Sequence, residues 1–120
     1  MRVLHHLEQS RSFRILWAME ELGLDYEVQY YQRQPNLSAP PALKQIHPLG
    51  KAPILTDQEQ VLAESAAILE YLQESYDEQQ QFRPEDPADK AQYRYWMHYA
   101  EGSLMPLLVM QLVMTTVPKH

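Results

Sequence analysis

The sequence predicts an α/β domain over residues 1–77, followed by the start of an all-α region. Three observations favour this fold class. Short apolar-rich runs at 2–7 and 26–31 flank a helical pattern, an order in which the two strands are normally parallel. A second pair of strand-like runs follows, separated by a polar turn. Helical periodicity then lies on both sides of a polar, proline-containing break at 78–87.

The first helix is expected to open in Ser10-Arg-Ser-Phe-Arg and to end at Leu22, because Gly23 suits the left-handed conformation that follows many helices. Apolar side chains lie around much of its circumference. A crossover helix of this kind is expected to be buried on more than one side against a sheet. These apolar residues are Phe13, Ile15, Leu16, Trp17, Ala18, Met19 and Leu22.

The middle of the domain is expected to contain a loop, a short helix, a hairpin and a longer helix. Residues 34–41 are rich in proline and polar side chains and predict the loop, and 42–46 predict the short helix. The hairpin strands are expected at 52–56 and 60–62. The longer helix is expected from Glu64 to Tyr76, so that the order of elements is βαβ, a short helix, then ββα.

Residues 78–87 are interpreted as a linker, and 88–120 as the first, incomplete part of an all-helical domain. Gly102 and Pro106 predict a kink or a break in its helix. One long helix with a continuous apolar face cannot bury that face alone. We therefore expect that the polypeptide is truncated or that partners from elsewhere cover the helix.

Composition narrows the functional classes. The 120 residues are 45% hydrophobic and 22% charged, with a net charge of −6, the balance of a soluble globular protein. The acidic surface disfavours a nucleic-acid partner. No apolar run is long enough to span a membrane. The polar start is unlike a secretory signal, so a cytoplasmic location is expected.

Metal and thiol chemistry are also disfavoured by composition. The absence of cysteine excludes disulfides, thiolate metal sites and a redox cycle run by the protein's own thiols. The five histidines show no ligand spacing. Neighbouring His5 and His6 are expected to point to opposite sheet faces, so no metal site is predicted.

Three motifs carry the functional signal: Ser10-x-Ser12 after the first strand, His47-Pro-Leu-Gly-Lys-Ala-Pro53 before the third, and Ala63-Glu-Ser-Ala-Ala-Ile68 at the third helix. In this order and spacing they resemble the cytosolic glutathione transferase family, in a serine-type, theta- or zeta-like or bacterial and fungal branch. The run 10–27 is also similar to that family's first helix and second strand. His47 departs from the family's usual asparagine and is interpreted as structural.

The resemblance implies a thioredoxin-like fold for residues 1–77 and a set of site residues. Ser10 is the expected catalytic hydroxyl, with Ser12 as the alternative; each is also suited to capping the helix. A cis bond is implied at Ala52-Pro53, where the Ala52 backbone would pair with the cysteinyl part of glutathione. The remaining implied glutathione-binding residues are Lys51 for the glycyl carboxylate, and Glu64 and Ser65 for the γ-glutamyl zwitterion.

The chemistry is within reach of one hydroxyl. A thiol with an ordinary pKa of about 8.5 needs a shift of about 1.5 units, or about 2 kcal/mol, to be half ionised at pH 7. A hydroxyl that donates to the sulfur anion supplies about 1.5 to 3 kcal/mol. The positive end of a helix adds about 0.3 to 1 kcal/mol. No general base is required.

The resemblance implies glutathione as co-substrate without another cofactor, a hydrophobic electrophile as second substrate, a detoxification role and a homodimer. Tyr99, Ser103 and Leu107 could border the electrophile, although packing explains each of them as well. Two other functions stay open: a non-catalytic interaction module with the same fold, and a glutathione-dependent peroxidase. A reductase is disfavoured because its members usually have a cysteine at the place of Ser10.

Overall fold

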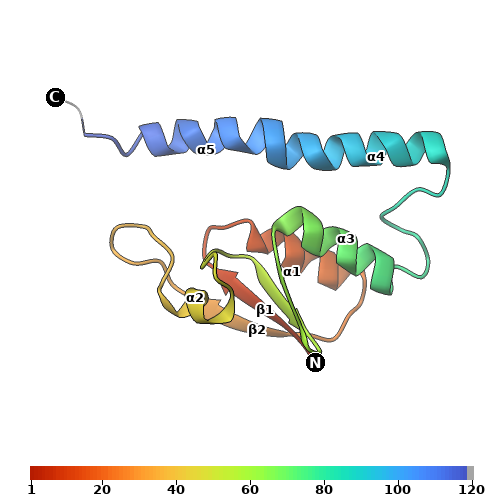
Figure 1. Ribbon diagram of the computed structural model, residues 1–120, viewed down its shortest axis with the longest axis horizontal. Coiled ribbons are helices and arrows are strands. Elements are labelled where there is room, and N and C mark those ends of the chain that lie inside the picture. The colour runs from red at the N-terminus through yellow and green to blue at the C-terminus, as the bar shows by residue number, and fades with distance from the viewer. Residues whose placement is uncertain (119–120) are drawn as a thin grey trace. The chain divides into compact units, whose positions relative to one another are not determined.

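The computed structural model describes residues 1–118 and divides the chain into two compact units, Met1–Glu78 and Gln79–His120. Lys119 and His120, which end the predicted helical region, lie outside the described residues. The first unit holds a mixed four-stranded sheet with three helices, and the second holds one long helical stretch (Figure 1).

The sheet has the strand order β2-β1-β3-β4. Parallel pairing joins β1 (Arg2–Leu7) to β2 (Glu27–Tyr31), with Leu4 opposite Val28. Antiparallel pairing joins β1 to β3 (Ile54–Asp57), and β3 to β4 (Gln60–Ala63). The predicted βαβ unit and hairpin are therefore confirmed. The hairpin turn is shorter than expected, because Asp57 pairs with Gln60 and only residues 58–59 connect the strands.

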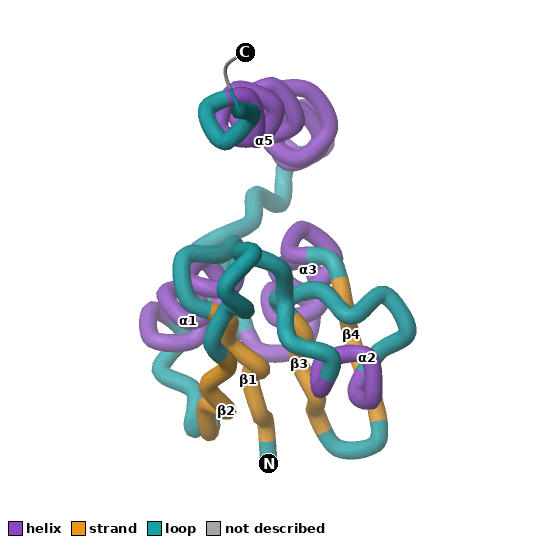
Figure 2. The backbone as a smooth tube through the Cα atoms, turned by 90° about the vertical axis from the view of Figure 1, so that its left-hand side faces the viewer, coloured by secondary structure: helices purple, strands orange, loops and turns teal. Residues whose placement is uncertain are grey.

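Two helices cover one face of this sheet, and the short third helix lies on the other (Figures 1 and 2). The pair consists of α1 (Ser12–Glu21) and α3 (Ser65–Tyr76), whereas α2 (Ala42–Ile46) supplies the buried Leu43. The core between the sheet and the pair contains six buried residues, which are Leu4, Ile15, Met19, Leu55, Ile68 and Leu72.

Helix α1 buries one face rather than several, which corrects the sequence expectation. Ile15 and Met19 are fully buried, whereas Phe13 is 58% exposed and Trp17 is 62% exposed. The reason is geometric: residues four apart share a helix face, so Ile15 and Met19 form one stripe and Phe13 and Trp17 another. Only the first of these stripes packs into the core of the unit.

The end of α1 follows the prediction. Gly23 has φ +67°, and its N–H donates to Glu20 O at 3.0 Å. The N–H of Leu24 donates to Met19 O at 3.1 Å. These two bonds form the Schellman motif, in which a left-handed residue satisfies the last carbonyls of a helix.

A buried polar cluster joins β3 to α3. Asp57 is 2% exposed, and its Oδ2 accepts hydrogen bonds from the hydroxyls of Tyr71, at 2.8 Å, and of Tyr76. The guanidinium carbon of Arg2 lies 4.6 Å from the centroid of the Tyr76 ring, within cation–π range. The carboxylate, with two donors, is therefore satisfied in its buried position.

The second unit begins with α4 (Pro87–Tyr99), continues through a π-helical segment, η1 (Ala100–Leu104), and ends with α5 (Met105–Met114). The Asp86 side chain caps α4. The predicted irregularity lies where Gly102 and Pro106 indicated it: the Met105 N–H donates to Ala100 O, five residues back. Proline has no N–H to continue the α-helical pattern, so a wider turn precedes it.

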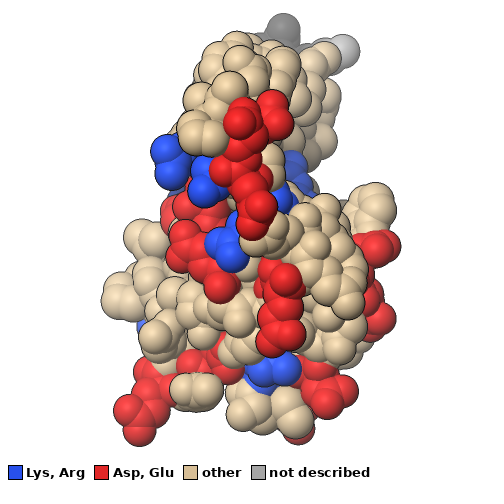
Figure 3. Space-filling view, turned by 90° about the vertical axis from the view of Figure 1, so that its right-hand side faces the viewer, with Lys and Arg blue, Asp and Glu red and all other residues tan. Residues whose placement is uncertain are grey.

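In residues 1–118, no helix combines the length and the hydropathy that a bilayer crossing requires. Acidic side chains are prominent on the face shown in Figure 3, as the net charge of −6 leads one to expect.

Candidate functional site

The sheet register brings the three sequence motifs to one end of the sheet. His5 lies opposite Ile54, and Ile54 lies opposite Ala63. The turn after Leu7, the segment before Ile54 and the start of α3 after Ala63 therefore emerge at the same end, called here the Leu7 end. Asp57 and Arg2 pair at the opposite end. The candidate site residues Ser10, Ala52 and Glu64 are thus carried by three neighbouring segments.

Ser10 lies in the turn between β1 and α1, two residues before the first helical residue. It is half-buried, and its hydroxyl donates to Leu7 O at 2.7 Å. Its Oγ also accepts the backbone N–H of Ser12 at 3.2 Å. The hydroxyl therefore satisfies one of the free N–H groups at the start of α1, where the helix dipole favours negative charge.

Ser12 has a different environment, although it lies only two residues further on. Its side chain is completely buried. Its Oγ lies 2.5 Å from Ser10 Oγ and 2.8 Å from His6 Nδ1, and it accepts the Leu7 N–H at 3.2 Å. With this set of partners, Ser12 connects the turn to the end of β1.

Arg33 braces the turn from the segment after β2. Its guanidinium donates to the carbonyls of Glu8 at 3.2 Å, Gln9 at 2.9 Å and Leu37 at 2.9 Å. Gln9 has φ +50°, an uncommon conformation for a residue with a side chain. The planar guanidinium can bind several carbonyls at fixed angles, which suits it to hold this turn directly before Ser10.

The segment that leads into β3 forms a tight turn followed by a cis peptide. The Gly50 N–H donates to His47 O at 2.9 Å, and Gly50 has φ +61°. His47 Nδ1 accepts the Leu49 N–H at 3.2 Å, in keeping with the structural role expected for His47. The Ala52-Pro53 bond is cis, as the family resemblance implied.

Lys51 and Ala52 lie just outside the sheet. The Lys51 side chain is exposed, whereas Pro53 is buried. Because β3 is an interior strand, with β1 on one side and β4 on the other, Ala52 lies before the start of a strand rather than along an open sheet edge. A peptide that pairs with Ala52 would therefore add at the strand end.

Glu64 and Ser65 form the junction between β4 and α3. Glu64 has φ +74° and ψ +119°, and its side chain is exposed. Ser65 is 3% exposed and is the first residue of α3. A non-glycine residue in such a conformation costs about 1 to 3 kcal/mol, and such residues cluster at functional sites.

Sequence reasoning missed His6 and Arg33. Burial lowers the pKa of His6, so its imidazole is neutral near pH 7. The sequence offered one signal for His6: it belongs to the same strand face as Leu4, the face on which α1 packs. Arg33 lies 23 positions after Ser10, and no local pattern connects the two residues. In residues 1–118, no group of three or more His, Asp or Glu side chains is arranged to hold a metal ion.

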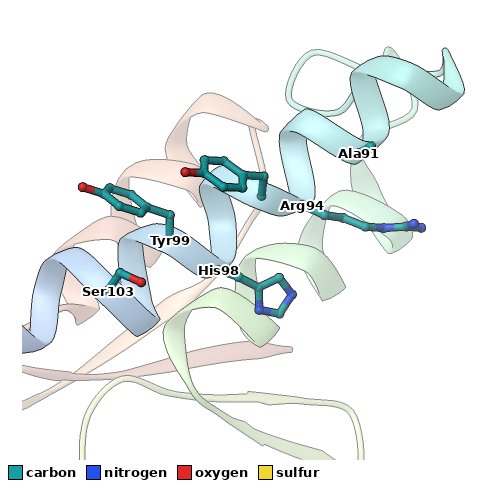
Figure 4. Close-up of a pocket in the computed structure, with 6 residues that line it drawn as sticks. Ala91, Arg94, His98, Tyr99 and Ser103 are labelled. Carbon is teal, nitrogen blue, oxygen red and sulfur yellow. The ribbon is translucent and has the colours of Figure 1, made fainter.

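Helix α4 carries a separate open hollow of about 400 Å³ (Figure 4). Tyr99 and Ser103, the possible electrophile contacts, both border it, and so do Arg94 and His98. All its lining residues come from 91–103, on one continuous helical stretch. A depression on the side of a single helix does not surround a small molecule as binding pockets usually do.

Comparison with known proteins gives a consistent result. The family model "Glutathione S-transferase, N-terminal domain" matches residues 1–74. Glutathione S-transferase 1 of Saccharomyces cerevisiae is 39% identical over 120 residues, which cover 95% of this chain and 51% of that protein. Glutathione S-transferase 3 of Schizosaccharomyces pombe is 47% identical over 108 residues, which cover 90% of this chain and 44% of that protein. The chain therefore spans about half the length of these curated relatives.

Solved structures of glutathione S-transferases are also similar to this chain. A crystal structure of a glutathione S-transferase from Actinobacillus pleuropneumoniae has a TM-score of 0.89 and 41% identity, and the match covers 100% of this chain and 56% of that one. The theta class glutathione S-transferase of Xanthomonas axonopodis pv. citri, solved with glutathione bound, has a TM-score of 0.69 and 28% identity, covering 85% and 49%.

Proposed function

The chain belongs to the glutathione S-transferase family, and we propose that it binds glutathione at the Leu7 end of the sheet and holds the thiol as a thiolate. The thiolate attacks a hydrophobic electrophile. The observation that carries this proposal is the convergence of Ser10, Ala52-Pro53 and Glu64-Ser65 at one end of the sheet, as the strand register requires.

Ser10 is the residue proposed to stabilise the thiolate. Its hydroxyl is half-buried, whereas Ser12 is completely buried, which favours Ser10 as the group that meets a ligand. In the reaction the thiol proton leaves to solvent and the Ser10 hydroxyl donates to the sulfur anion. The sulfur electron pair then forms a bond to carbon of the electrophile, by addition or with loss of a leaving group. The hydroxyl hydrogen bond and the helix start together offset the cost of ionisation near pH 7.

The rest of the tripeptide is assigned by charge and backbone complementarity. The backbone of Ala52 binds the cysteinyl unit, Glu64 binds the γ-glutamyl ammonium, and Ser65 binds its carboxylate. Lys51 binds the glycyl carboxylate. The exposed side chains of Lys51 and Glu64 and the start of α3 support this placement. The glutathione bound in the Xanthomonas relative supports the choice of ligand.

The same proposal extends to the roles of the chain's segments and to its assembly. Residues 1–77 bind glutathione, 78–87 form a linker, and 88–120 begin the helical domain that lines the electrophile site. The chain acts as a homodimer.

The ultraviolet absorbance of glutathione thiolate, recorded on adding the protein near pH 7, tests the proposal. The parent is expected to increase the absorbance, and Ser10→Ala to abolish the increase. Ser75→Ala, an exposed serine near the end of α3, is the matched control. Equal spectra for the parent and Ser10→Ala would exclude Ser10 as the thiolate donor. Parallel assays with a chloro-aromatic compound and a peroxide separate conjugation from peroxidase activity.

A further inference from the structure

We propose that His6 and Ser12 are positioning residues, which act through a chain of hydrogen bonds to make Ser10 a stronger donor toward the glutathione sulfur. This inference rests on the proposed role of Ser10. Neither residue needs to touch the substrate.

The chain of hydrogen bonds is continuous in the structure. His6 Nδ1 lies 2.8 Å from Ser12 Oγ, and Ser12 Oγ lies 2.5 Å from Ser10 Oγ. Ser12 is completely buried, so water does not interrupt the chain at its middle member. His6 belongs to β1, Ser10 lies in the turn that follows it, and Ser12 is the first residue of α1.

The hydrogen-bond distances favour one direction for these bonds, from His6 through Ser12 to Ser10. Each hydroxyl has one hydrogen to donate. The Ser10 hydrogen goes to Leu7 O, a carbonyl that can only accept, at 2.7 Å. The single Ser12 hydrogen has two acceptors within reach, Leu7 O at 3.2 Å and Ser10 Oγ at 2.5 Å. We assign it to the nearer one, Ser10 Oγ. In that arrangement the His6–Ser12 bond uses a hydrogen on His6 Nδ1.

The protonation of His6 is compatible with this direction. Burial lowers the pKa of His6, so the ring carries one N–H near pH 7. When that hydrogen is on Nδ1, it points toward Ser12 Oγ. The other ring that faces His6 is Tyr30 from β2, whose centroid lies 5.8 Å away in an edge-on arrangement. The imidazole is thereby held between α1 and β2.

When glutathione binds, only the hydrogen bond that Ser10 donates to Leu7 O has to change. The Ser10 hydrogen turns from Leu7 O to the sulfur anion, while Ser10 Oγ keeps its two donors from Ser12, the backbone N–H at 3.2 Å and the hydroxyl. Two donors on the oxygen hold it in place and polarise its remaining O–H bond. Hydrogen bonds in a chain strengthen one another in this way in a low-dielectric surrounding.

The test measures the pKa of the glutathione thiol bound to the 120-residue chain, from thiolate absorbance against pH, together with the dissociation constant for glutathione. Ser10→Ala should return the thiol pKa to about its free value of 8.5. Ser12→Ala and His6→Leu should each raise the thiol pKa of the complex by about 0.5 pH unit, because each removes part of the chain. His6→Asn should restore the parent value, since its amide places an N–H near the position of Nδ1. Ser75→Ala is the unchanged control.

The outcomes separate the two proposals. If Ser10→Ala raises the thiol pKa while Ser12→Ala and His6→Leu match the parent, a contribution from the hydrogen bonds of His6 and Ser12 is excluded and the role of Ser10 stands. If Ser10→Ala has no effect, both proposals fail. If His6→Asn behaves like His6→Leu, His6 acts through packing and its role as a donor is excluded. Should Ser12→Ala fail to fold by circular dichroism, the pair of His6 variants still decides the result.

Discussion

Ser10 and Ser12 show how burial separates two residues of the same type. Two positions apart, they share a hydrogen bond of 2.5 Å. Ser10 is half-buried and Ser12 has no exposed surface. A side chain with no exposed surface cannot donate to a ligand without a rearrangement of the turn. We therefore propose different roles for the two residues, Ser10 as the thiolate donor and Ser12 as its support.

Glu64 combines an unusual backbone with an exposed side chain. Its φ of +74° directs the chain from β4 into α3, and Glu64 O accepts the Ile68 N–H at 2.9 Å. Glycine would adopt this φ without strain. A glutamate at this position is consistent with the proposed need for a carboxylate at the ammonium of glutathione.

Glu64→Gln is expected to weaken glutathione binding about 2- to 5-fold, because an exposed ion pair contributes about 0.2 to 1 kcal/mol. Isothermal titration calorimetry measures the change. Glu59→Gln, in the exposed hairpin turn, is the control and should bind as the parent does. An unchanged dissociation constant for Glu64→Gln would show that this carboxylate does not bind the ammonium.

The turn between β1 and α1 is held by contacts from the end of β1 and from the segment after β2. Arg33, after β2, binds the carbonyls of Glu8 and Gln9. His6, on β1, contacts Ser12. The position of the Ser10 hydroxyl therefore depends on the segment after β2 as well as on the helix that follows it.

Arg33→Lys is expected to lower the rate of conjugation several-fold with little loss of global stability. A lysine ammonium keeps the charge but cannot reproduce the planar set of donors that reaches three carbonyls. Steady-state kinetics and urea unfolding, measured on the same samples, check the two parts of the prediction. Arg83→Lys, in the linker 78–87, is the matched control. Equal rates for Arg33→Lys and the parent would contradict a role in positioning Ser10.

Stability of the first unit is expected to depend on pH through its tyrosines. Burial, with the hydrogen bond from its hydroxyl to Asp57, raises the pKa of Tyr71. The hydrogen bond to Glu20 raises the pKa of Tyr26 to about 12. A raised pKa means that the folded state keeps its proton longer than the unfolded chain, whose tyrosines titrate at about 10. This contribution is fully present below about pH 10 and is lost as the pH rises through the folded pKa.

The urea midpoint is therefore expected to fall as the pH is raised from 9 to about 11. Tyr71→Phe should be less stable at pH 8, because Asp57 loses a hydrogen-bond donor, by about 1 to 3 kcal/mol. It should also lose less stability between pH 9 and 11. Tyr95→Phe, on α4, is the control variant. Parallel pH profiles for the parent and Tyr71→Phe would show that Tyr71 does not couple to unfolding in this range.

The second unit leaves a large apolar surface uncovered. Leu107 is 71% exposed, Leu112 is 66% exposed and Met110 is 61% exposed, and apolar residues lie on all sides of α5. Surfaces of this extent normally meet another surface. We expect the chain to associate with itself at micromolar concentrations, as sedimentation velocity or light scattering would detect. A strictly monomeric chain would contradict the homodimer proposal for this length of polypeptide.

Local signals were sufficient for most of the secondary structure. The strand at 2–7, the helix end before Gly23, the short helix at 42–46 and the irregularity between Gly102 and Pro106 all depend on periodicity, on backbone freedom or on a missing N–H, which neighbouring residues specify. The cis peptide at Ala52-Pro53 was expected because the motif at 47–53 resembles that of the family.

Other features needed the packed chain. Whether α1 buries one face or several depends on what lies against it, and periodicity alone contains no record of that. The contacts of His6 with Ser12 and of Arg33 with Gln9 join residues through space. Hydrogen bonds and burial act over a few ångströms, whereas sequence patterns report only on neighbours along the chain. The candidate donor could therefore be read from its motif, but the residues that hold it became visible only after folding brought them together.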